Sequence, residues 1–72
     1  MKSRVKWFND AKGYGFIENN EFEDVFVHYS QIKKDGYKSL TTGDMVQFDL
    51  ITTDKGYQAK NVALINDSVI VN

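Results

Sequence analysis

The chain contains no cysteine, no proline and a single histidine. Without cysteine it can form neither a disulfide nor a thiolate metal site, and the lone His28 has no carboxylates at ligand spacing. No apolar run approaches the roughly 18 residues of a membrane-spanning helix. The N-terminal residues lead into Trp7 rather than into the apolar segment of a signal peptide. We therefore expect no metal, no cofactor, no membrane association and a cytoplasmic location.

The chain is also short. Its 72 residues can build one domain around one small core. Because nothing cross-links the fold, we expect a free energy of unfolding of only about 3–5 kcal/mol. Large aromatic side chains that are exposed in so small a protein therefore suggest a binding function.

The charges are unevenly distributed along the chain, although the formal net charge is only −1. Nucleic-acid-binding domains usually have an isoelectric point above about 9. Cations surround the first expected strand: Lys2, Arg4, Lys6 and Lys12. Carboxylates cluster after the second: Glu18, Glu21, Glu23 and Asp24. We expect a positive face and an acidic opposite edge; the alternative is that these charges only solvate the surface.

Alternating apolar residues and turn signals predict short β-strands. The expected strands cover residues 4–9, 14–18, 24–28, 46–51 and 58–65. One helical turn is expected at residues 29–32, and the polar segment that follows, up to residue 44, is too long for a tight turn. Five short strands with one long central connection predict an all-β fold that closes into a small barrel.

Aromatic side chains recur at strand spacing in the second and third expected strands. Tyr14 and Phe16 are two residues apart, as are Phe26 and His28, so each pair points to one face of the sheet. The residues of opposite parity form the expected core face: Ile17, Val25 and Val27. Unpaired bases stack on exposed rings with about 1–3 kcal/mol each. The pattern predicts binding of single-stranded nucleic acid.

The first expected strand does not fit simple alternation. If Val5 points inward, Trp7 also points inward and Phe8 outward. We expect the core to contain the remaining phenylalanines: Phe8, Phe22 and Phe48. A β-bulge could reverse the alternation, but the sequence does not show where one lies.

Three segments resemble the cold shock domain family in order and spacing: VKWFN at 5–9, KGYGFI at 12–17 and DVFVHYS at 24–30. The similarity extends over about residues 3–64, so we expect a cold shock domain at 1–65 and a C-terminal tail at 66–72. The resemblance implies a five-stranded antiparallel barrel of the OB-fold type. It also implies that single-stranded RNA or DNA binds across the first three strands.

The resemblance also assigns roles to individual residues. The implied stacking residues are Trp7, Tyr14, Phe16, Phe26, His28, Tyr29 and Tyr37. The implied polar contacts to phosphates or bases come from Lys6, Asn9, Lys12, Asp24, Lys55 and Gln58. Three of these positions are tyrosine where the family commonly has phenylalanine, which keeps the ring: Tyr14, Tyr29 and Tyr37. Lys55 replaces a frequent arginine and loses its planar group.

The predicted function is that of a monomeric RNA chaperone that keeps transcripts unpaired. Its sequence preference is expected to be weak and to favour pyrimidine-rich stretches, as in the family. Such a chaperone would affect transcription antitermination or translation. One alternative is a barrel whose aromatic face docks another protein, because an exposed apolar patch also permits that. A small nuclease is a further alternative, but His28 has no recognisable catalytic partner. We therefore expect no enzymatic activity.

Overall fold

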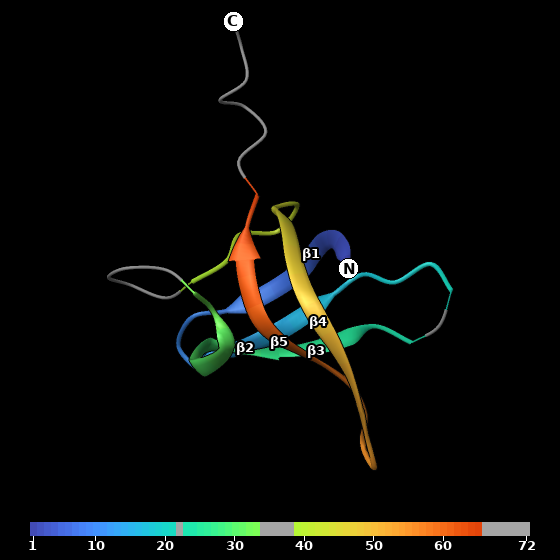
Figure 1. Ribbon diagram of the computed structural model, residues 1–72. Helices are drawn as coiled ribbons and strands as arrows, with labels where there is room; N and C mark the ends of the chain where they lie inside the picture. Colours follow the sequence, from blue (N-terminus) through green and yellow to red (C-terminus); the bar gives the residue numbers. More distant parts are fainter. Residues whose placement is uncertain (22, 34–38, 66–72) are drawn as a thin grey trace, which may run out of the picture.

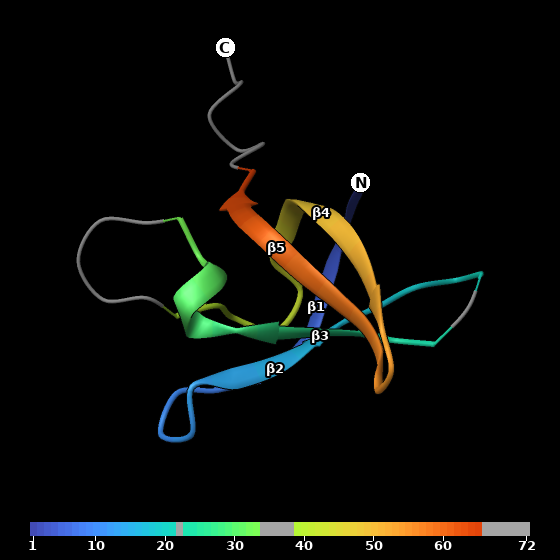
Figure 2. The ribbon, with the colours of Figure 1, turned by 60° about the horizontal axis from the view of Figure 1, so that its bottom comes forward.

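The computed structural model describes residues 1–21, 23–33 and 39–65. Its elements are, in chain order, β1 (Lys2–Asn9), β2 (Tyr14–Ile17), β3 (Val25–His28), the 3₁₀ helix η1 (Tyr29–Gln31), β4 (Met45–Thr53) and β5 (Gly56–Leu64). The strands close into a barrel with the neighbour order β1-β2-β3-β5-β4 (Figures 1 and 2). The predicted all-β barrel and the predicted helical turn after the third strand are confirmed.

One strand pairing differs from the expected antiparallel arrangement. β3 and β5 run parallel and are joined through the Cα partners Phe26 and Gln58, whereas the other neighbouring pairs are antiparallel. The reason is geometric, because directions can alternate all the way around a closed ring only when the number of strands is even. A closed barrel of five strands must therefore contain a parallel pair.

The strand ends differ from the expected ones by one or two residues. β1 begins at Lys2 instead of residue 4 because its first three residues pair with β4. β2 ends at Ile17 and β3 begins at Val25, so each is one residue shorter than expected. β5 covers Gly56–Leu64 rather than 58–65.

A β-bulge in β1 resolves the conflict in its side-chain alternation. Val5 pairs with Ile17 and Trp7 pairs with Phe16, which leaves Lys6 as the extra residue. Val5 is therefore buried, and Phe8, three residues later, packs against the core. Trp7 turns outward and is 39% exposed. Phe8 thus lies on the core side, as predicted.

A second bulge lies in β5, at a position that the sequence does not mark. Gln47 pairs with Ala63 and Asp49 with Lys60, so that one residue of β4 opposes two of β5. Asn61 occupies the bulge with a φ of 54° and donates a hydrogen bond from Nδ2 to Asp49 Oδ2 at 2.9 Å. Because the bulge shifts the alternation, the buried residues of β5 are three positions apart: Ala59 and Val62.

Substitution of Asn61 tests this bulge. Asn61→Ala is expected to lower the free energy of unfolding by about 1–2 kcal/mol, because alanine is strained at positive φ. Asn61→Gly should cost less, since glycine adopts this φ without strain. Urea unfolding of both variants measures the difference, and equal losses would show that the side-chain hydrogen bond matters more than the backbone conformation.

The core occupies the inside of the barrel. The fully buried side chains include Phe48, Ile17, Val5, Val25, Val27, Val46 and Val62, so the predicted core positions 17, 25, 27 and 48 are confirmed. Ile32 and Leu40 add to the core from the connection between β3 and β4. Phe22 lies outside the described residues. In the described part of the chain, no helix has the length and apolarity to cross a membrane.

Candidate nucleic-acid interface

Strand pairing aligns the aromatic residues in two adjacent rows on the outside of the barrel. One row of Cα partners crosses β1, β2, β3 and β5: Trp7, Phe16, Phe26 and Gln58. The neighbouring row crosses β1, β2 and β3: Asn9, Tyr14 and His28. Paired residues of adjacent strands share a face of the sheet. Seven of the predicted site residues therefore lie together on one face.

Four of these side chains form a continuous surface, which we call the ring platform: Trp7, Tyr14, Phe16 and Phe26. The ring centroids of Trp7 lie 5.9 Å from Tyr14 and 5.5 Å from Phe16. Phe26 closes the group, with its centroid 5.7 Å from both Tyr14 and Phe16. The rings are tilted by 35–70° to one another, so the platform is stepped. None of them belongs to the buried core.

Gly15 allows β1 and β2 to approach closely beneath the platform. A Cβ atom at this position would lie 2.2 Å from the carbonyl oxygen of Trp7 and 2.7 Å from Cα of Phe8. No real Cβ tolerates such contacts. The glycine between Tyr14 and Phe16 therefore has a structural role, because it permits the strand spacing that aligns the rings.

Tyr29 extends the aromatic surface beyond the end of β3. Its ring lies over Gly13, where a Cβ would come within 2.8 Å of Tyr29 Cδ1, and its centroid is 4.6 Å from that of His28. Tyr29 N also donates a hydrogen bond to Gly13 O at 2.8 Å. The ring is nevertheless 48% exposed. Tyr29 therefore offers a further stacking face, whereas Tyr37 lies outside the described residues.

Hydrogen bonds determine which polar atoms of this face remain for a ligand. Asn9 Oδ1 accepts a hydrogen bond from Lys12 N at 2.9 Å and so holds the β1–β2 turn. His28 Nδ1 accepts from Ser30 N at 3.2 Å at the start of η1. A ligand can then contact Nδ2 of Asn9 and Nε2 of His28. The role of Ser30 in orienting the imidazole had no signal in the sequence.

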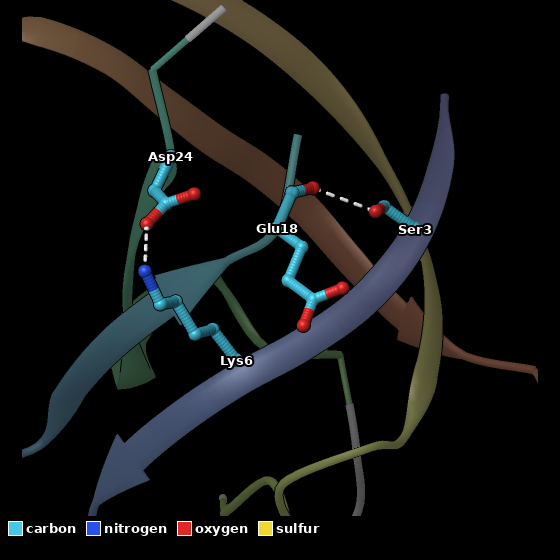
Figure 3. A network of polar contacts seen from close by, with 4 residues as sticks. All are labelled: Ser3, Lys6, Glu18 and Asp24. Carbon is cyan, nitrogen blue, oxygen red and sulfur yellow. Dashed lines mark hydrogen bonds and ion pairs between the residues drawn. The ribbon is translucent and has the colours of Figure 1, made fainter. Parts of the chain in front are cut away.

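Lys6 and Asp24 form an ion pair at one end of the ring platform. Lys6 Nζ lies 2.8 Å from Asp24 Oδ2, and the side chains are 52% and 33% exposed. Figure 3 shows the pair beside Glu18, whose backbone carbonyl accepts a hydrogen bond from Ser3. The hydrogen bond to Asp24 and its charge, with a smaller effect of Glu18, raise the pKa of Lys6 above its ordinary value. Lys6 is therefore a cation at neutral pH.

This pairing alters the expected separation of charges. Glu18 and Asp24 were expected at an acidic edge opposite the positive face, but both lie beside Lys6. The reason is the sheet register, which places the end of β2 and the start of β3 next to the β1 bulge. Among the described residues, Lys6–Asp24 is the one ion pair within 4.0 Å. Lys12 and Lys55 therefore remain as cations without such a partner.

Lys12 and Lys55 lie at opposite ends of the aromatic face. Lys12 is exposed in the β1–β2 turn, on the side of η1, and Lys55 is exposed at the tip of the β4–β5 hairpin (Figure 2). Thr53 Oγ1 stabilises this tip by accepting from Lys55 N at 3.1 Å. Glu23, which precedes β3, lines a depression of about 530 Å³ together with the residues of this tip. Both cations therefore lie on exposed turns that flank the aromatic face.

Comparison with known proteins identifies the family. Residues 1–65 match the family model described as the 'Cold-shock' DNA-binding domain. The chain belongs to the cold shock domain family. It is 56% identical over 62 residues to the cold shock-like protein CspC of Bacillus cereus, which covers 86% of this chain and 95% of that protein. It is 57% identical over 58 residues to the cold shock protein CspA of Staphylococcus aureus, and this alignment covers 81% of this chain and 88% of that protein.

A solved structure supports the fold. The cold shock domain described here aligns with a chain of Drosophila Unr at a TM-score of 0.74 and 15% identity over 97% of its length, and it spans 28% of the Unr chain. The resemblance predicted from the sequence is thus confirmed, and the protein is a nucleic-acid-binding domain of this family.

Within the described residues, no group of three or more His, Cys, Asp or Glu side chains could hold a metal ion.

Proposed function

We propose that this cold shock domain binds single-stranded RNA and single-stranded DNA across β1, β2 and β3, and that it acts as an RNA chaperone without enzymatic activity. The observation that carries this proposal is the ring platform, in which four aromatic side chains contact one another outside a core that is already filled. Stacking on rings tolerates any base, because every base has a π face. This supports a weak sequence preference, with pyrimidine-rich strands as the family default.

The domains proposed are a binding unit at 1–65 and a tail at 66–72, and the binding unit acts as a monomer in the cytoplasm. Its stacking residues are the ring platform with His28, Tyr29 and Tyr37. Its polar contacts come from Lys6, Asn9, Lys12, Asp24, Lys55 and Gln58. The common position of these groups on one face supports the assignment for the described residues. Tyr37 rests on the family resemblance.

Chaperone activity follows from mass action. A protein that binds only the unpaired form stabilises it by RT ln(1 + [L]/Kd), which is about 2.7 kcal/mol at a hundredfold excess over Kd. Stacking in a DNA duplex averages about 1.4 kcal/mol per step. One bound molecule therefore offsets roughly two steps, so weak hairpins open and long stems do not. The opening of weak hairpins in a transcript would affect transcription antitermination or translation.

The fluorescence of Trp7, the single tryptophan of the chain, provides the test. We expect a single-stranded oligonucleotide to quench it in a saturable manner, because Trp7 belongs to the ring platform. A duplex of the same sequence should have no such effect, since its base faces are already stacked. If Lys12 and Lys55 each neutralise one phosphate, the logarithm of the binding constant should fall with the logarithm of salt at a slope of about −1.4.

The alternative of a protein-docking barrel makes a different prediction. In that case neither oligonucleotide would change the fluorescence of the folded protein. Incubation of RNA with the protein and Mg²⁺ tests the nuclease alternative at the same time, and intact RNA is the expected result.

A further inference from the structure

The Lys6–Asp24 ion pair lies beside the ring platform. Lys6 is the extra residue of the β1 bulge and directly precedes Trp7. Asp24 directly precedes β3, and its carboxylate contacts the Lys6 side chain. Figure 3 shows the lysine side chain reaching from β1 to the aspartate that precedes β3. The cation next to Trp7 in the chain thus already has an anionic partner.

Asp24 offers Lys6 the same type of acceptor that a phosphate would offer. The contact of 2.8 Å between Nζ and Oδ2 has the length of a charge-assisted hydrogen bond. Glu18 adds a second negative charge nearby. Both members of the pair are solvent-accessible, and an ion pair this exposed is weak enough to exchange partners. A phosphate can therefore displace Asp24, but only in competition with it.

We propose that Asp24 is an intramolecular competitor of phosphate for Lys6 and makes the ring platform select unpaired bases over polyanionic charge alone. The proposal rests on the proposed function and concerns its selectivity. A base-free sugar-phosphate chain, like the outside of a duplex, offers only phosphates and must displace Asp24 without any stacking. A single strand with bases also gains stacking on the rings, and in the proposed function its bases donate hydrogen bonds to the Asp24 carboxylate that the phosphate has displaced. The ion pair therefore lowers the affinity more for ligands that lack accessible bases than for ligands that have them.

The variant Asp24→Asn removes the competing charge and keeps the shape of the side chain. Two probes of equal length separate the contribution of phosphate contacts from that of base stacking. One is an abasic oligodeoxynucleotide, which cannot stack, and the other is oligothymidylate, which can. We expect Asp24→Asn to bind the abasic strand about two- to fivefold more tightly at low salt. Its salt slope should steepen by about 0.7, because one more phosphate is neutralised. The preference for oligothymidylate over the abasic strand should fall accordingly.

Glu21→Gln is the matched control, because it removes the same charge from an exposed residue of the β2–β3 connection. Lys6→Gln alone and combined with Asp24→Asn complete a double-mutant cycle. In the absence of Lys6, the gain in affinity for the abasic strand that Asp24→Asn causes should shrink to the gain that Glu21→Gln causes. Melting temperatures verify that each variant is folded, which is expected because the pair lies on the surface.

Two results would overturn the proposal. One is that Asp24→Asn binds the abasic strand no more tightly than Glu21→Gln does. The other is that its gain persists without Lys6, which would assign the gain to overall charge. Failure of the proposed function is separate, since it would appear as failure of the wild-type protein to bind oligothymidylate. The abasic probe reports on the competition in either case, because it does not depend on stacking.

Discussion

Replacing Phe26 by alanine is expected to weaken binding of a single-stranded oligonucleotide by about 1–3 kcal/mol, roughly a fivefold to 150-fold rise in Kd. Phe26 closes the ring platform on β3, where its ring lies 5.7 Å from those of both Tyr14 and Phe16. Its loss removes one stacking face and the packing that holds two neighbouring rings. Titration of Trp7 fluorescence measures the change. The same range is expected for Phe16→Ala.

Substitutions of matched size separate stacking from general hydrophobic contact. Phe26→Tyr keeps a flat ring and should bind almost as well as the wild type, whereas Phe26→Leu keeps apolar bulk and should lose most of the affinity. Leu64→Ala changes an apolar residue that is 44% exposed but outside the ring platform, and should have no effect. Wild-type affinity in a folded Phe26→Ala variant would rule out the ring platform as the binding surface.

The two phenylalanines are also expected to be coupled. Because their rings contact each other, loss of one changes the position of the other. The double variant should then lose less affinity than the sum of the single losses. Strict additivity would instead indicate that each ring contacts its base independently.

The sequence predicted those parts of the fold that depend on regular alternation. Val25 and Val27 point inward, and Phe26 and His28 point outward. This follows because β3 is a regular strand, in which the alternation of side chains alone determines which face each residue occupies. β1 and β5 each contain a bulge, and a bulge depends on the register of the partner strand. The conflict in alternation around Val5 was visible in the sequence. The position of the bulge at Lys6, however, follows only from the pairing of β1 with β2.

The aromatic part of the candidate site was likewise predictable, whereas its electrostatics were not. The spacing of Tyr14 and Phe16 is a local property of one strand. The contact between Lys6 and Asp24 joins residues 18 positions apart and requires both the β1 bulge and the antiparallel pairing of β2 with β3. No local pattern encodes it. The sequence therefore indicated which residues are charged, but not that these two would pair.

The substitution Gly15→Ala is expected to reduce stability more than any other change considered above. The added Cβ would lie 2.2 Å from the Trp7 carbonyl oxygen and 2.7 Å from Phe8 Cα, and backbone atoms cannot rotate away as a side chain can. Overpacking typically costs about 1–3 kcal/mol, and this contact should be at or above the upper end. Against a total of about 3–5 kcal/mol, a substantial fraction of the protein would unfold.

Thermal unfolding followed by circular dichroism measures this loss. At about 4–8 °C per kcal/mol for a domain of this size, the melting temperature should fall by roughly 12 °C or more. Gly43→Ala is the control, because Gly43 has a φ of +92° but no atom within 4 Å of the added Cβ. That change introduces backbone strain alone, of order 1–2 kcal/mol. If Gly43→Ala proved as damaging as Gly15→Ala, backbone strain and not the close approach of β1 and β2 would control the stability of the sheet beneath the ring platform.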